Sequence, residues 1–154
     1  MSDFTRFLEN YQQEAEAEKS RNETLKNDWI KAVADLRDLI IGWLVEPINL
    51  GLVTFKQPKI EITEERFGKY TTTELILNFS PSGTAVEIKP IARFIVDAIG
   101  RVDIFSNKGR YKIIRKAEDE EWYVVEPDYT GAEPFKLTKL NEDSLGRILT
   151  ELIK

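Results

Sequence analysis

The sequence predicts an α+β fold, with a long N-terminal helix, an antiparallel meander of six to eight strands and a short C-terminal helix packed on the sheet. Three observations support this prediction. Apolar residues recur at spacings of three and four over residues 25–46, as in an amphipathic helix. Segments of alternating apolar and polar residues follow, and glycine-containing turns separate them. A helix-start signal then stands at Asn141, close to the C-terminus.

Length and composition suggest a single domain. The chain has 154 residues, of which 42% are hydrophobic and 32% charged, and no linker or internal repeat divides it. We therefore expect one α+β domain over residues 1–154.

The charge balance limits the class of partner. A net charge of -5 argues against a nucleic-acid binder, because neutralising phosphate groups requires a basic surface. The same acidity argues against binding to anionic membranes. The longest apolar run is too short to span a bilayer, and the N-terminus lacks the basic and apolar regions of a secretory signal. We therefore expect a cytoplasmic protein with no nucleic acid and no membrane among its partners.

The chain contains no cysteine and no histidine. Without cysteine there is no disulfide, no thiolate metal site and no thiol nucleophile. Without histidine the chain lacks the commonest general base and the commonest metal ligand. Carboxylate, lysine and tyrosine chemistry remains open, but these absences favour a protein without catalytic activity and without a cofactor.

The N-terminal segment predicts a helical arm. Residues 12–22 are polar and carry no apolar stripe, so residues 1–21 are expected to project from the domain. Ser20 and Glu23 fit a capping box, which predicts a break near Ser20; one unbroken helix is the alternative. Four large apolar side chains share one helical face before the polar stretch: Phe4, Phe7, Leu8 and Tyr11.

Residues 25–46 predict a strongly amphipathic helix that ends at Pro47. Leu25, Trp29 and Leu36 belong to a heptad seam, and further apolar residues make the buried face wider than one neighbouring helix requires. We expect this helix to cover one face of the sheet. The alternative is that part of the seam joins the arm in a dimer contact.

The strand region begins at residues 52–56 and continues with a hairpin of residues 59–67 and 70–80. Gly68 and Lys69 suit its turn, because glycine comes first in a type II′ turn. This register places Ile62 opposite Leu75.

A second hairpin turns at residues 80–83, which read SPSG. Counting outward from the turn places Leu77 opposite Val86 and Leu75 opposite Ile88. Apolar residues then meet on one face, as a half-buried antiparallel pair requires.

A third hairpin turns at residues 106–109, which read SNKG. It places Val102 opposite Ile113 on the apolar face and Asp103 opposite Lys112 on the polar face. A shift of one residue would bury the charged pair.

Residues 90–100 can be interpreted in two ways. A strand that is bent or interrupted near residues 98–100 agrees with the β-branched composition, and a helix agrees with Pro90 at its start and Gly100 at its end. We favour the strand. Further strands are expected at residues 110–116, 122–126 and 135–137, before a helix capped by Asn141. Eleven residues are predicted to be mostly buried: Trp29, Leu36, Ile40, Leu75, Leu77, Val86, Val102, Ile104, Ile113, Leu145 and Leu149.

One pattern could carry catalytic chemistry. Glu87 and Lys89 form an E-x-K motif, and the register places Glu74 across from Lys89. In metal-dependent nucleases such a motif and a carboxylate one strand earlier hold Mg²⁺. A chain this rich in charge produces E-x-K by chance, and a cross-strand ion pair explains the same residues, so we favour the ion pair.

Other residues are candidates for contact with a ligand or partner. Arg93 and Arg101 alternate with acidic residues and predict either outer-face ion pairs, which we favour, or the lining of a cleft. Trp122 and Tyr129 could form the floor of a ligand pocket, although packing in the core or at an edge is favoured. The aromatic residues of the arm complete the set: Phe4, Phe7 and Tyr11.

These features favour a non-catalytic protein-binding or accessory protein. The first alternative is a small-molecule-binding domain that uses the concave face of the sheet. The second is a histidine-free, carboxylate-dependent metal enzyme built on the E-x-K motif. Because apolar residues on a solvated arm need a partner, we also predict a homodimer formed through the N-terminal helix.

Overall fold

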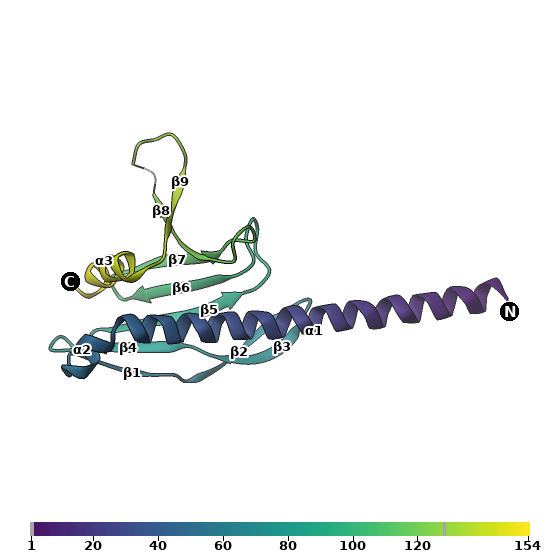
Figure 1. Ribbon diagram of the computed structural model, residues 1–154, viewed down its shortest axis with the longest axis horizontal. Helices are drawn as coiled ribbons and strands as arrows, with labels where there is room; N and C mark the ends of the chain where they lie inside the picture. Colours follow the sequence, from purple (N-terminus) through teal and green to yellow (C-terminus); the bar gives the residue numbers. More distant parts are fainter. Residues whose placement is uncertain (1, 128) are drawn as a thin grey trace.

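The computed structural model of the protein describes residues 2–127 and 129–154. Three helices and nine strands follow one another within these residues (Figure 1): α1 Asp3–Trp43, α2 Val45–Asn49, β1 Val53–Lys56, β2 Lys59–Glu64, β3 Gly68–Thr73, β4 Leu75–Phe79, β5 Ala85–Ala92, β6 Arg101–Ser106, β7 Gly109–Arg115, β8 Trp122–Pro127, β9 Phe135–Lys139 and α3 Glu142–Ile153. None of these helices is long and apolar enough to cross a membrane.

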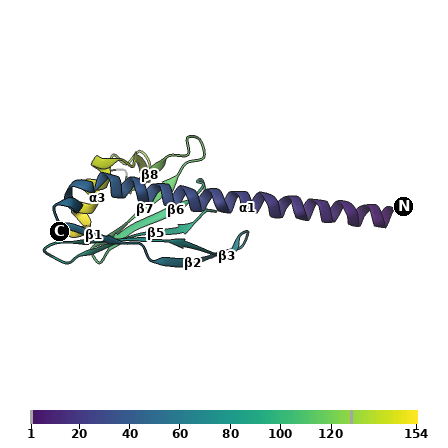
Figure 2. The same cartoon turned by 60° about the horizontal axis from the view of Figure 1, so that its bottom comes forward.

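The strands form two antiparallel sheets. Seven strands make the larger sheet in the order β1-β4-β5-β6-β7-β8-β9, and β2 and β3 make a separate two-stranded sheet. The C-terminal half of α1 and the short α3 cover the same face of the larger sheet (Figures 1 and 2). The predicted α+β class and the order of its main parts are therefore confirmed.

The hydrophobic core lies between the helices and the larger sheet. Because α1 contributes a broad apolar face and every second strand residue points inward, one continuous cluster forms. All the predicted core residues are buried, from Trp29 and Leu36 on α1 to Leu145 and Leu149 on α3.

Two of the three predicted hairpins have the expected register. Leu75 pairs with Ile88 across β4 and β5, and Phe79 N donates to Thr84 O at 3.0 Å beside the turn. In β6 and β7, Asp103 stands opposite Lys112 in the register, as expected. Local turn chemistry and alternation were sufficient here because both point to the same register.

The hairpin predicted around Gly68 and Lys69 is wrong in register. Ile62 pairs with Tyr70, not with Leu75, and the segment predicted as one strand over residues 70–80 is split between β3 and β4. The split occurs at Glu74, whose backbone N–H donates to Pro58 O at 3.0 Å. Beyond this point the chain leaves β2 and pairs with β1 instead.

A buried hydrogen-bond chain explains why β3 takes this position. Trp29 Nε1 donates to the Tyr70 hydroxyl at 3.1 Å, and that hydroxyl donates in turn to Glu64. Burial, followed by the hydrogen bond and charge of Glu64, raises the pKa of Tyr70 well above its ordinary value, so it remains a donor. The Glu64 carboxylate also accepts from the backbone N–H groups of Arg93 and Phe94, at 2.9 and 3.1 Å.

The same carboxylate determines the structure of residues 93–100. Neither interpretation of residues 90–100 is correct: β5 ends at Ala92, and residues 93–100 are an irregular segment with a single bridge between Ile95 and Ala98. Because Glu64 takes the two N–H groups, they do not continue the β5 ladder. Asp97 and Gly100 then adopt positive φ angles of 64° and 152°.

Helix α1 shows two further differences from the sequence-based expectations. It runs without the break expected near Ser20, since good helix formers surround this position and Thr24 Oγ1 donates to Ser20 O at 3.2 Å. Pro47 does not end it either. The helix ends at Trp43, and Pro47 lies in the first turn of α2, where its missing N–H group costs no hydrogen bond.

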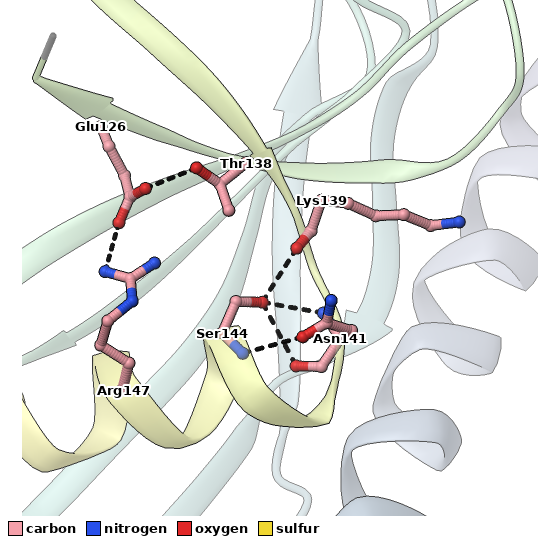
Figure 3. A network of polar contacts seen from close by, with 6 residues as sticks. All are labelled: Glu126, Thr138, Lys139, Asn141, Ser144 and Arg147. Carbon is pink, nitrogen blue, oxygen red and sulfur yellow. Dashed lines mark hydrogen bonds and ion pairs between the residues drawn. The ribbon is translucent and has the colours of Figure 1, made fainter.

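Helix α3 begins as predicted. Ser144 N donates to the Asn141 side chain and Asn141 N donates to Ser144 Oγ, both at 2.8 Å (Figure 3). Leu140 and Leu145 on either side of this cap are both buried, which agrees with a hydrophobic staple.

Candidate functional site

The N-terminal part of α1 projects from the rest of the molecule (Figures 1 and 2). All of residues 3–21, which we call the arm, are exposed, and they extend over roughly 28 Å. The first partly buried residue is Asn22, whose side-chain oxygen accepts from Arg66 Nη2 at 3.1 Å. Ser2 caps the tip by accepting from Thr5 N at 3.1 Å.

A stripe of large apolar side chains runs along the arm. The exposed fractions are 68% for Phe4, 59% for Phe7, 46% for Leu8 and 64% for Tyr11. The rings of Phe7 and Tyr11 stack with their centroids 6.1 Å apart, so the stripe is one continuous surface. We call these four residues the arm stripe.

The arm stripe points to the same side of α1 as the sheet. Tyr11 precedes Trp29 by 18 residues, which is about five helical turns, so the two side chains leave the helix in the same direction. Trp29 is fully buried between α1 and the sheet. The stripe therefore points to the side of α1 on which the sheet lies. The N-terminal turns of α1 extend beyond the β2–β3 turn (Figure 2), which lines a hollow with Ala15, Glu18 and Lys19.

The E-x-K residues lie around the start of β4 and on β5. Glu74 is 9% exposed, and one of its carboxylate oxygens has no hydrogen-bond partner among the described residues. Burial raises the pKa of Glu74 above its ordinary value; the charge of Glu87 raises it further and Lys89 lowers it. Within residues 2–127 and 129–154, no group of three or more acidic side chains could hold a metal ion.

Arg101 forms an ion pair on the sheet face opposite to the helices, as favoured from the sequence. Its Nε and Nη2 donate to the two oxygens of Asp103 at 2.8 and 2.9 Å, and Arg110 Nη1 approaches the same carboxylate at 2.5 Å. Asp103 is fully buried, so the two cations compensate its charge. Hydrogen bonding to Asp103 raises the pKa of Arg101.

Arg93 lies in the irregular segment instead, 5.2 Å from the ring centroid of Phe94. Burial, together with the charges of Arg115 and Arg66, lowers the pKa of Arg93. It does not share a site with Arg101, so the structure does not bring the two predicted arginines together as a cleft lining.

Trp122 is a core residue and not the floor of a ligand pocket. It is 9% exposed, and its ring lies 6.0 Å from that of Trp29. Tyr129, at 89% exposed, lies apart from it beside the β8–β9 hairpin, where it lines a hollow of about 650 Å³ against α3.

An ion-pair network crosses this hollow and fastens the hairpin to α3 (Figure 3). Thr138 Oγ1 donates to Glu126 at 2.6 Å, and Arg147 Nη1 lies 2.5 Å from the other carboxylate oxygen. Burial raises the pKa of Glu126, but the bonds from Thr138 and Arg147 outweigh it, so the pKa falls below its ordinary value. Thr138 and Arg147 each bind one carboxylate oxygen of Glu126, so the network has a structural explanation.

A second hollow, of about 450 Å³, lies between residues 95–97 and β9. Its lining combines exposed apolar side chains such as Val96 and Leu137 with the cations Arg101 and Lys112. Only Arg101 was predicted from the sequence. The alternation of β7 places Ile114 on the outer face and could have identified it as a lining residue. Val96 could not be identified in this way, because its position depends on the irregular segment.

No protein-family model, no curated protein and no solved structure matches this chain. The functional assignment therefore rests on the geometry of the chain itself.

Proposed function

We propose that this is a non-catalytic protein-binding protein and that its arm is the contact element. The observation that carries this proposal is the arm stripe, in which four large apolar side chains are between 46% and 68% exposed. Contiguous exposed apolar surface on a folded protein usually marks a binding site.

The geometry of the arm supports a polypeptide partner over a small molecule. Phe4, Phe7, Leu8 and Tyr11 occupy positions i, i+3, i+4 and i+7, the spacing by which amphipathic helices insert into a groove of another protein. The stripe lies on a convex helix with no concave wall of its own, whereas small-molecule sites are concave.

Helix energetics give a second argument. An isolated helix of the arm's length is marginally stable in water, because nucleation is costly and packing supplies most helical stability in proteins. Residues 3–21 have no such packing in the isolated chain. A partner that covers the stripe would bury apolar surface and stabilise the helix together.

Site-specific photo-crosslinking in producing cells tests the proposal. The photoreactive residue p-benzoyl-phenylalanine replaces Phe7 in one variant and Gln13 in the other. Gln13 lies two residues beyond Tyr11 and therefore on the opposite face of the arm. We expect polypeptide adducts from position 7 and none from position 13. Equal adducts from both positions, or none from position 7, would exclude the arm stripe as a contact surface.

The second hollow favours a second candidate function, the binding of a small amphipathic anion on the sheet face opposite to the helices. Its volume of about 450 Å³ suits a small ligand. Exposed Val96 and Leu137 offer an apolar wall, and Lys112 forms no ion pair with the described residues. Fluorescence of 1-anilinonaphthalene-8-sulfonate should rise with the wild type and with Leu39→Glu, a control at an exposed leucine of α1 outside the hollow, but not with Leu137→Glu. An equal response from the two variants would reject the site.

A further inference from the structure

We propose that the partner of the arm is a second copy of this chain, packed antiparallel about a two-fold axis. In this dimer Phe4 faces the partner's Ala15 and Leu8 faces the partner's Tyr11. The inference rests on the proposed function, because it assigns the occupant of the same stripe.

The arm cannot be covered by its own domain. Helix α1 is continuous from Asp3 to Trp43, so the stripe stays at a fixed distance from the sheet. Among the described residues, the β2–β3 turn comes near the arm, but it lines a hollow with Ala15, Glu18 and Lys19 and not with the arm stripe. The cover must therefore come from another chain.

The direction of the stripe selects the antiparallel arrangement. Because Tyr11 and Trp29 leave α1 on the same side, the stripe and the sheet lie on the same side of the helix. Two parallel arms facing each other would force both sheets into the space between the helices. Two antiparallel arms place the sheets at opposite ends of the contact, where they do not meet.

The apolar pattern selects the register. The stripe continues from Tyr11 to Ala15 and then reaches Glu18, so its apolar part ends there. A two-fold axis between residues 9 and 10 brings Phe4 opposite the partner's Ala15 and Leu8 opposite the partner's Tyr11. Large side chains then meet small or flat ones, and Glu18 stays outside the contact.

This register also fits the length of the arm. With the axis between residues 9 and 10, the tip residue Ser2 lies opposite the partner's Ala17. In each copy, Ala15, Glu18 and Lys19 line a hollow of about 420 Å³ together with the β2–β3 turn. The tip of one arm would therefore enter the hollow of the other copy, and it would end roughly 7 Å before the partner's Asn22, the first partly buried position. A longer overlap would bring Glu18 into the contact, and a shorter one would leave Phe4 uncovered.

The area is sufficient for a specific dimer. With exposed fractions of 46% to 68%, the arm stripes of two copies would together bury roughly 900 Å². A specific interface needs about 1,000 Å² in total. Ala15 and the aliphatic parts of the flanking side chains supply the remainder. The interface would be mostly apolar, as in stable homodimers, and self-complementary, as two-fold symmetry requires.

Analytical ultracentrifugation of the full-length protein tests the association. Phe7→Glu and Gln13→Glu each add one negative charge, the first within the stripe and the second on the opposite face. We expect the wild type and Gln13→Glu to sediment as dimers at micromolar concentration, and Phe7→Glu to dissociate more readily by roughly 30-fold or more. A wild type that stays monomeric at millimolar concentration, or a control variant that dissociates equally, would refute the dimer. Circular dichroism checks that each variant keeps its sheet.

Cysteine crosslinking tests the orientation, and the chain has no native cysteine to interfere. A disulfide needs Cα atoms within about 7 Å of each other. We expect an equimolar mixture of Phe4→Cys and Ala15→Cys to form a mixed disulfide on oxidation. Ala15→Cys alone should form none, because the two copies of residue 15 would lie roughly 16 Å apart along the helices. A disulfide from Ala15→Cys alone would indicate parallel arms, and no disulfide in the mixture would refute the register.

The photo-crosslinking experiment separates this inference from the proposed function. An adduct from position 7 with twice the mass of the chain supports both. An adduct with a different polypeptide, together with a monomeric wild type, refutes the dimer and supports the arm as a protein-binding element. No adduct and no dimer would refute both.

Discussion

Gly100 is the position where a single methyl group should be most costly. Gly100 follows the irregular segment with a φ of 152°, which side chains rarely adopt. A Cβ at this position would lie 2.7 Å from Cη2 and 2.9 Å from Cε3 of Trp29, and closer still to Cζ3. Neither the backbone at Gly100 nor the Trp29 ring can move freely. Gly100 O accepts from Arg115 N at 3.0 Å, and the Trp29 indole is held by its hydrogen bond to Tyr70.

The magnitude follows from two costs and one small gain. Inserting a methyl group into a close-packed core costs about 1–3 kcal/mol, and an unfavourable backbone conformation costs about 1–3 kcal/mol more. Alanine also reduces the conformational entropy of the unfolded chain, which stabilises the folded state by roughly 0.4–1 kcal/mol. We therefore expect Gly100→Ala to lower the free energy of unfolding by about 3 kcal/mol and the Tm by roughly 6–12 °C.

Urea denaturation followed by tryptophan fluorescence measures this change, and Gly42→Ala is the matched control. Gly42 lies on the exposed side of α1 and nothing would lie within 4 Å of its Cβ, so that variant should be more stable by about 0.5–1 kcal/mol. A Trp29→Leu background should reduce the cost of Gly100→Ala, because the ring that it meets is gone. Equal midpoints for Gly100→Ala and the wild type would refute the packing described here.

Three further predictions concern the core and the carboxylates. Leu36 is 3% exposed, so Leu36→Ala should lower the free energy of unfolding by about 2–5 kcal/mol in the same denaturation assay. A decrease of less than about 0.5 kcal/mol would contradict the place of Leu36 in the core. Burial raises the pKa of Glu74 in the folded state. The contribution of Glu74 to the free energy of unfolding is therefore fully present below its unfolded pKa of about 4.3, and it is lost as the pH rises through the raised pKa of the folded state. Glu74→Gln should therefore be more stabilising relative to the wild type at pH ~8 than at pH ~4; equal differences at the two pH values would argue against this burial effect. Millimolar Mg²⁺ or Mn²⁺ should leave the Tm unchanged, since ligands that bind the native state raise it, and a rise that disappears in Glu87→Gln would point to a metal site.

Several parts of this fold were determined by local sequence. The turns at residues 80–83 and 106–109 define their hairpins, because turn chemistry and alternation agree on one register. The Asn141 cap is equally local, since its partner Ser144 is three residues away. Trp29 and Leu36 of the predicted seam identified the buried face of α1, but Leu39, which the same spacing places in the seam, is 47% exposed. The arm stripe was visible in the sequence as four apolar residues before a polar stretch.

Tertiary structure decided the rest, through contacts between residues that are far apart in the sequence. Tyr70 bonds to Trp29 across 41 positions, and Glu64 binds the backbone of Arg93 across 29. These bonds separate β3 from β4 and end β5 at Ala92, where periodicity predicted continuation. No local pattern contains such pairings, because they depend on which chain segments meet after folding. The same holds for the functional surface: the sequence placed apolar residues on the arm, but only the packing of Trp29 against the sheet determined the side to which the arm stripe points.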